Sequence, residues 1–156
     1  MARRKVTRSV NDKHTYHTLT YAGVMPFLAG AILPWLGVTS LGPLGAVYPA
    51  LLSYGLAIVS FLCGTQWAVE LAGAGSARLP LFLLSNLIVV ATWLAALAAP
   101  LGAALLVQIA ALAILLAVDG RLRGADRLSG DYWILRQRIT LIACIALAVA
   151  IVGTWR

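Results

Sequence analysis

The pattern of apolar and polar positions divides the chain into five long apolar stretches separated by short polar breaks. A helix needs roughly 20 mainly apolar residues to cross about 30 Å of hydrocarbon. Five stretches meet this requirement, at about 19–38, 47–71, 79–98, 102–119 and 135–155. The apolar runs are continuous and do not alternate with a period of two, which argues against a membrane β-barrel. The pattern predicts an all-α membrane protein, a bundle of five transmembrane helices.

Glycine and proline mark the breaks between these stretches. Gly42-Pro43 lies in the first break and Pro100 in the third, and the only long break runs from 119 to 137. Short connections of this kind make successive helices antiparallel neighbours. Pro26 and Pro34 fall inside the first stretch, where we expect them to kink the helix. Neighbouring helices can satisfy the carbonyl groups that such a kink frees.

Composition narrows the class of protein further. Of the 156 residues, 62% are hydrophobic and only 11% are charged, and the mean hydropathy is +0.92. A soluble domain of this size is about half apolar and a quarter charged. The composition therefore excludes an ordinary soluble enzyme, a disordered protein and a disulfide-stapled secreted module. We expect a basic cytoplasmic tail over 1–18, a retained signal anchor after it, and one transmembrane domain over 19–156.

The positions of Lys and Arg predict how the helices are oriented. If all five stretches span the membrane, eleven of the twelve basic residues lie on one side, and only Arg156 lies on the other. By the positive-inside rule, the N-terminus is inside and the C-terminus outside. This sorting accounts for the net charge of +7 without a nucleic-acid partner. The basic tail and the fourth loop are also suited to attract anionic lipid headgroups.

Polar side chains gather in the inner half of the predicted bundle. Such residues inside a membrane are costly, face protein or water, and are candidates for function. A Glu70–Arg136 or an Asp119–Arg136 pair would connect the second, fourth and fifth helices. The cluster either handles a substrate or a proton, or only holds the helices together through interhelical hydrogen bonds. Gln108 is a further candidate for such a bond. The candidate cluster comprises Gln66, Glu70, Asn86, Asp119, Tyr132, Arg136 and Thr140.

The second apolar stretch carries small residues along one helical face. Ala57, Ser60, Gly64 and Trp67 recur at spacings of three and four residues, and Ser60 and Gly64 form a pair of small residues four apart. Small residues at this spacing allow another helix to approach closely. The face is therefore a candidate helix-packing face, or alternatively a groove for a lipid or a partner helix with Trp67 as its interfacial wall.

No motif for catalysis or cofactor binding is found. The sequence has no GxSxG, HExxH, P-loop or CxxC motif, and such motifs mark hydrolases, metalloproteases, nucleotide-binding proteins and redox or metal sites. His14 and His17 stand alone in the tail, too few to hold a metal. We therefore predict no catalytic residue, no cofactor and no metal site.

Three short motifs resemble a known family. They are Gly23-Val24-Met25-Pro26-Phe27, Ser60-Phe61-x-x-Gly64-x-x-Trp67, and Tyr132-Trp133-x-x-Arg136 leading to Ile139-Thr140. Together they resemble the small integral-membrane family called domain of unknown function 3429, which is similar to transmembrane protein 69. The resemblance extends over nearly the whole chain, although Cys63 stands where a second glycine is expected before Gly64. It implies a small helical bundle in the bacterial cytoplasmic membrane, or in the mitochondrial inner membrane of a eukaryote, and implies no activity.

Three functions from different classes fit these observations. The first is a non-enzymatic accessory, assembly or scaffolding component of a membrane complex. Its partners would be the lipid bilayer and another membrane protein. The second is a small transporter or channel that acts as a homo-oligomer. The third is an interfacial enzyme acting on a lipid headgroup, for which Glu70, Asp119, Tyr132 and Arg136 would supply acid–base and anion-holding groups.

Overall fold

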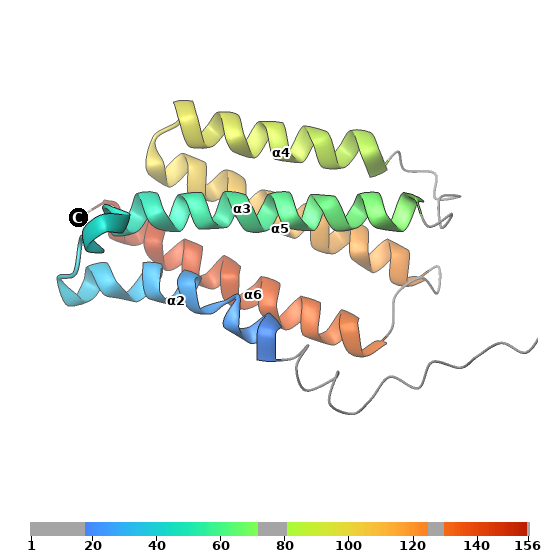
Figure 1. Ribbon diagram of the computed structural model, residues 1–156, viewed down its shortest axis with the longest axis horizontal. Helices are drawn as coiled ribbons and strands as arrows, with labels where there is room; N and C mark the ends of the chain where they lie inside the picture. The colour runs from blue at the N-terminus through green and yellow to red at the C-terminus, as the bar shows by residue number, and fades with distance from the viewer. Residues whose placement is uncertain (1–17, 72–80, 125–129, 156) are drawn as a thin grey trace, which may run out of the picture.

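The computed structural model describes residues 18–71, 81–124 and 130–155 as an antiparallel helical bundle (Figure 1). The elements, in chain order, are a helical turn over 18–22, α2 (Met25–Ile32), the 3-10 helices η1 (Leu33–Leu36) and η2 (Gly42–Leu44), α3 (Val47–Val69), α4 (Leu81–Ala98), α5 (Leu101–Gly124) and α6 (Gly130–Gly153). No strand occurs in the described ranges, where the one β-bridge joins Ser40 to Ala46.

Five helical segments are long and apolar enough to cross a membrane: Thr18–Leu36, Val47–Val69, Leu81–Ala98, Leu101–Arg123 and Gly130–Gly153. They confirm the five predicted helices. The two largest differences from the predicted bounds are that α5 continues past 119 and that α6 begins before 135. A helix can extend beyond its apolar stretch because its backbone hydrogen bonds do not depend on apolar side chains. Basic residues in its last turn and acidic residues in its first turn also interact favourably with the helix dipole. Arg121 and Arg123 lie in the last turn of α5, and Asp131 lies in the first turn of α6.

The first span is broken at its prolines, as predicted. Pro26 lies at the start of α2, and Pro34 at the start of η1. At the first break the Phe27 amide donates to Val24 O at 3.0 Å, so it does not donate to Gly23 O as a regular α-helix requires. The Tyr54 hydroxyl of α3 donates to Gly23 O at 2.7 Å instead. A neighbouring helix therefore satisfies the freed carbonyl, as expected in a membrane.

Two spans, α3 and α5, each pack against three others. The helix α5 packs against α3, α4 and α6, while α2 packs against α3 and α6, and α3 packs against α4. Fully buried Val59, Leu105 and Leu147 belong to the core between these helices. Large apolar side chains such as Phe61, Leu87 and Leu141 point outward and are well exposed. An apolar exterior over an apolar core fits a bilayer rather than water as the surrounding solvent. The chain is a multi-pass membrane protein.

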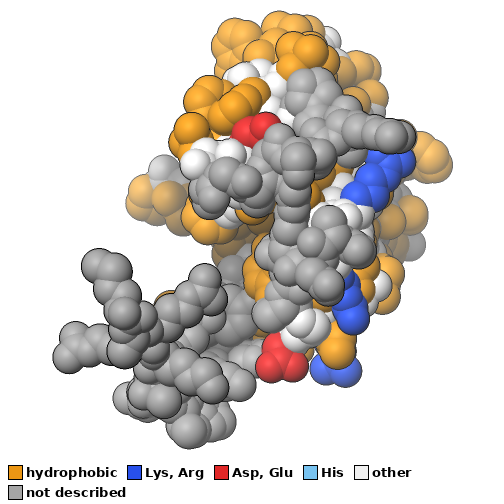
Figure 2. All heavy atoms as spheres, turned by 90° about the vertical axis from the view of Figure 1, so that its right-hand side faces the viewer, with side chains coloured by type: hydrophobic (Ala, Val, Ile, Leu, Met, Phe, Trp, Pro, Cys, Tyr) orange, Lys and Arg blue, Asp and Glu red, His pale blue; other side chains and the backbone are white. Residues whose placement is uncertain are grey.

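Charged side chains gather at one end of the bundle. Figure 2 looks onto this end, where α3 and α5 finish and α4 and α6 begin, and shows Arg, Asp and Glu side chains beside apolar ones. Arg121, Arg123 and Arg138 belong to the elements at this end. Arg136 is also described, on α6, whereas the basic residues in 1–17 and at 78, 127 and 156 lie outside the described residues.

Candidate functional site

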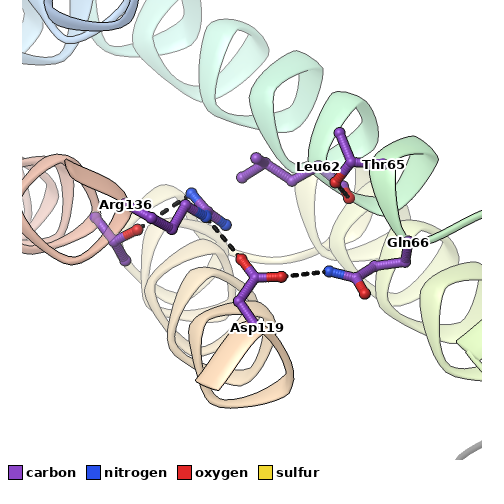
Figure 3. A network of polar contacts seen from close by, with 6 residues as sticks. Leu62, Thr65, Gln66, Asp119 and Arg136 are labelled. Carbon is purple, nitrogen blue, oxygen red and sulfur yellow. Dashed lines mark hydrogen bonds and ion pairs between the residues drawn. The ribbon is translucent and has the colours of Figure 1, made fainter. Parts of the chain in front are cut away.

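A chain of polar contacts connects three helices near the charged end. Asp119 of α5 accepts a hydrogen bond from Gln66 Nε2 of α3 at 2.7 Å through Oδ1. It accepts another from Arg136 Nε of α6 at 2.8 Å through Oδ2. Arg136 Nη1 donates to Thr140 Oγ1 at 3.2 Å. Figure 3 shows Asp119 between Gln66 on one side and Arg136 on the other. We call these four residues the polar network.

The helical register explains how the polar network comes together. Arg136 and Thr140 are four residues apart, so they lie one above the other on the same face of α6. Gln66 shares the buried face of α3 with Val59 and Leu62. Asp119 is the acidic residue that precedes the basic end of α5, and it faces both other helices.

The ion pair in this network is buried between α5 and α6. The side chains of Arg136 and Asp119 are 8% and 7% exposed. Two opposite charges in a low-dielectric interior neutralise each other, and each is costly to leave alone. The pair connects α5 to α6, and the amide of Gln66 extends the connection to α3. Of the two ion pairs expected for Arg136, the structure forms the one with Asp119.

Two of the seven predicted cluster residues, Asn86 and Glu70, form no hydrogen bond or ion pair with the polar network in the described part of the chain. Asn86 is exposed and donates to Phe82 O of its own helix at 2.9 Å, which differs from the predicted interhelical bond. Glu70 does not pair with Arg136, and its Oε2 is buried with no hydrogen-bond partner among the described residues. Tyr132 lies on α6, where it lines a pocket together with Arg136 and Thr140. The sequence therefore placed four of the seven residues in direct contact.

Ser85 takes the position that Asn86 was expected to occupy. Trp67 Nε1 of α3 donates to Ser85 Oγ of α4 at 2.9 Å, and Ser85 in turn donates to Phe82 O at 3.0 Å. The Trp67 ring also meets the Phe82 ring edge-on, with centroids 4.8 Å apart. Successive residues of an α-helix are rotated by about 100° about the helix axis, so Ser85 is buried while the next residue, Asn86, is exposed.

The predicted packing face on α3 points mostly away from the bundle. Ala57, Ser60 and Gly64 are exposed, and a Cβ added at Gly64 would meet nothing within 4 Å. Trp67 contacts α4 through Ser85 and Phe82. We call Ala57, Ser60 and Gly64 the outer α3 face. Its packing on a partner helix stays a prediction.

A pocket of about 450 Å³ lies beside the polar network. The first span, α3, α5 and α6 enclose it with mainly apolar side chains, including Phe27, Ile58, Leu112 and Ile139. Arg136 also lines it. Sequence reasoning missed the pocket, because it arises from the break at Pro26 and from the spacing of helices, neither of which a hydropathy pattern measures.

Residues 13–152 match the family described as Protein of unknown function (DUF3429). The chain belongs to the DUF3429 family. The family model includes all three motifs on which the sequence resemblance was based. No curated protein and no solved structure shows significant similarity to this DUF3429 chain. Similarity to transmembrane protein 69 stays a prediction.

The described part of this DUF3429 protein holds no group of three or more His, Cys, Asp or Glu side chains placed to bind a metal ion. His14 and His17 lie outside the described residues. The described site consists of the Asp119–Arg136 ion pair, the Gln66 amide and the Thr140 hydroxyl that bond to it, and an apolar pocket beside them.

Proposed function

We propose that this DUF3429 protein is a non-enzymatic accessory, assembly or scaffolding component of a larger membrane complex. The observation that carries the proposal is the outer α3 face. Ala57, Ser60 and Gly64 are exposed in the middle and end of a membrane-spanning helix, and the space beside Gly64 is open. Small side chains allow a second helix to approach closely, and close van der Waals packing drives helix association in lipid.

The polar network supports the same proposal. Its ion pair connects α5 to α6, and the hydrogen bond from Gln66 to Asp119 connects α3 to α5. A catalytic group or a transport site would need its charge available to a substrate, whereas Asp119 uses both carboxylate oxygens on Gln66 and Arg136. The network thus holds together a framework whose outer surface is left for contact with another protein.

We further propose that the protein lies in the bacterial cytoplasmic membrane with its N-terminus inside. The gathering of Arg121, Arg123 and Arg138 at one end supports this orientation, since basic residues next to spans are retained on the cytoplasmic side. Placing the charged end inside also brings the polar network to the inner half of the membrane.

The test is affinity isolation of the full chain from native membranes in mild detergent, with mass spectrometry of the proteins that remain bound. Gly64→Leu fills the open space on the outer α3 face. Ala113→Leu is the matched control, because Ala113 is exposed on α5. We expect the wild type and Ala113→Leu to retain a partner protein in a fixed ratio. Gly64→Leu should lose at least nine-tenths of it while its melting temperature stays unchanged.

Two outcomes would contradict the proposal. Full retention of the partner by Gly64→Leu would show that the outer α3 face is not the contact. Isolation of a lone monomer or homo-oligomer would remove the accessory function itself. The transporter would then be tested by solute flux in proteoliposomes, and the interfacial enzyme by turnover of lipid headgroups.

A further inference from the structure

The pocket beside the polar network opens sideways from the bundle. It lies between the first span, α3, α5 and α6, and α3 and α6 are not among the closely packed helix pairs. Two of its lining side chains, Leu19 of the first span and Phe61 of α3, are 67% and 68% exposed. Both belong to spans, where the surrounding solvent is lipid hydrocarbon rather than water. The mouth of the pocket therefore faces the acyl chains of the bilayer.

The polar side chains around the pocket are already engaged within the protein. Thr65 Oγ1 donates to a carbonyl of its own helix at 2.7 Å, and Thr140 Oγ1 accepts from Arg136 Nη1 at 3.2 Å (Figure 3). Arg136 Nη2 is buried, and Thr20 and Tyr132 interact with other residues. A water molecule needs two to four polar partners to occupy a cavity stably. The pocket is therefore suited to hydrocarbon.

The size of the pocket fits a single chain and not a helix. Its volume of about 450 Å³ is that of a small-molecule site. Its lining along α6 runs from Tyr132 to Ala143, which is about 16 Å at 1.5 Å per residue. A helix segment of this length, about 10 Å across, fills roughly 1,200 Å³. An extended acyl chain is much thinner, because carbon atoms pack at about 4 Å from their neighbours.

The pocket starts at the charged end of the bundle and runs inward. Tyr132, the first pocket residue on α6, is two residues after Gly130, where the helix begins. Ala143, at the other end of the lining, lies one face of α6 further into the span. A lipid whose chain occupies the pocket therefore has its headgroup at the charged end.

Charge at this end determines which headgroup fits. Outside the polar network, three described arginines of α5 and α6 outnumber the two described carboxylates at this end, Glu70 and Asp131. Residues 1–18, which directly precede Leu19, hold five Lys or Arg and one Asp. Lys13 is six residues before Leu19, so the chain between them spans at most about 22 Å. Basic residues beside a span attract anionic headgroups.

We propose that the pocket holds one acyl chain of an anionic phospholipid. The chain lies along Ile58, Leu112 and Ile139, and the headgroup lies at the charged end, where the basic tail joins the first span. An occupied pocket gains the dispersion contacts that an empty one lacks. This lipid would be bound whether or not the outer α3 face contacts a protein partner.

Photolabelling of the full chain in nanodiscs of phosphatidylcholine tests the proposal. The discs contain a trace of phosphatidylglycerol or of phosphatidylcholine with a diazirine in the middle of one acyl chain, and mass spectrometry locates the labelled residues. We expect the phosphatidylglycerol probe to label Ile58 and Ile139 at least fivefold more than the phosphatidylcholine probe, because basic residues attract its headgroup. Leu87 of α4, which is exposed and outside the pocket, should be labelled equally by both probes.

Two results of this experiment would overturn the proposal. Label at Leu87 without label at Ile58 and Ile139 would mean that no acyl chain enters the pocket. Equal labelling of Ile58 and Ile139 by the two probes would mean that charge does not select the headgroup.

A second test fills the pocket. Ala143→Leu adds three carbons at a position on the pocket wall, and Ala148→Leu makes the same change on the exposed side of α6. We expect Ala143→Leu to lower the labelling of Ile58 by the phosphatidylglycerol probe at least fivefold, and Ala148→Leu to leave it unchanged. A folded Ala143→Leu protein that is labelled like the wild type would refute the pocket as the site. If Ala143→Leu does not fold, the comparison of the two probes on the wild type decides.

Discussion

At the residue scale, Asp119 and Arg136 depend on each other. Both side chains are more than nine-tenths buried, and their nearest atoms are 2.8 Å apart. In this setting the cost of removing two charges from water offsets much of their attraction, so the pair is a weak source of stability when intact. Loss of one partner has a much larger effect, because the other charge then stays buried without a counter-ion.

Asp119→Asn tests this dependence. The change keeps the shape of the side chain and removes its charge, so the Arg136 guanidinium is left uncompensated. We expect the free energy of unfolding, measured by titration with a denaturing detergent in mixed micelles, to fall by about 3–5 kcal/mol. A double variant, Asp119→Leu with Arg136→Leu, should recover most of the loss.

Asp131→Asn is the control for this experiment. Asp131 is exposed in the first turn of α6, where loss of its charge removes a favourable interaction with the helix dipole of about 1 kcal/mol or less. Equal stability of Asp119→Asn and the wild type would mean that the ion pair is not needed to hold α5 against α6.

The polar network also shows how far residue-level prediction reaches. Gln66, Asp119, Arg136 and Thr140 could be predicted as one cluster, because the alternation of antiparallel helices fixes the depth of each residue. Depth alone could not separate Ser85 from Asn86, since the two differ by a rotation about the axis of α4. Apolar residues surround this helix on all sides, so the sequence carries little information about which side faces the core.

At the element scale, glycines set how closely the helices approach. A Cβ added at Gly30 of α2 would lie 2.8 Å from Leu51 Cδ1 of α3. At Gly55 of α3 an added Cβ would overlap the amide of Gln108 of α5. Gln108 is fully buried, and its Nε2 donates to Leu52 O at 2.7 Å. The expected interhelical role of Gln108 is confirmed, and it requires a glycine opposite.

Gly55→Ala tests this close approach, with Gly64→Ala as the matched control on the same helix. The new methyl group at Gly55 must displace Gln108 and break its bond to Leu52 O, so we expect a loss of about 1–3 kcal/mol. Gly64 has open space around it, and alanine there should stabilise the helix by up to about 1 kcal/mol. Thermal unfolding of both variants in the same detergent measures the difference, and a stable Gly55→Ala protein would contradict the packing described.

Element boundaries were less predictable than element number. The five spans follow from the length of the apolar stretches, and the break near Pro26 follows from proline chemistry. The apolar pattern does not predict that α5 extends to Gly124 or that α6 starts at Gly130. A helix continues for as long as its backbone hydrogen bonds form, whether or not its side chains are apolar. Hydropathy marks the part of a helix inside the lipid, not the whole helix.

At the scale of the whole molecule, the described charged side chains are distributed unevenly along the bundle axis. Arg121, Arg123 and Arg138 lie at the end where α6 begins, which Figure 2 faces. Among the described residues, the opposite end, where α3 and α5 begin, carries no Lys, Arg, Asp or Glu. By the positive-inside rule, we expect the basic end to lie on the cytoplasmic side, as proposed above.

Fusions after Trp155 in a bacterial host measure this orientation. We expect alkaline phosphatase fused there to be active, since it folds only outside the cytoplasm, and a green fluorescent protein fused there to stay dark. The same fluorescent protein placed before the basic tail should be bright. Replacing Arg121, Arg123 and Arg138 together by glutamine should lower the phosphatase activity, because it removes part of the charge that retains this end inside. A bright fusion after Trp155 would reverse the bundle, and would move the polar network and its pocket from the inner half of the membrane to the outer half.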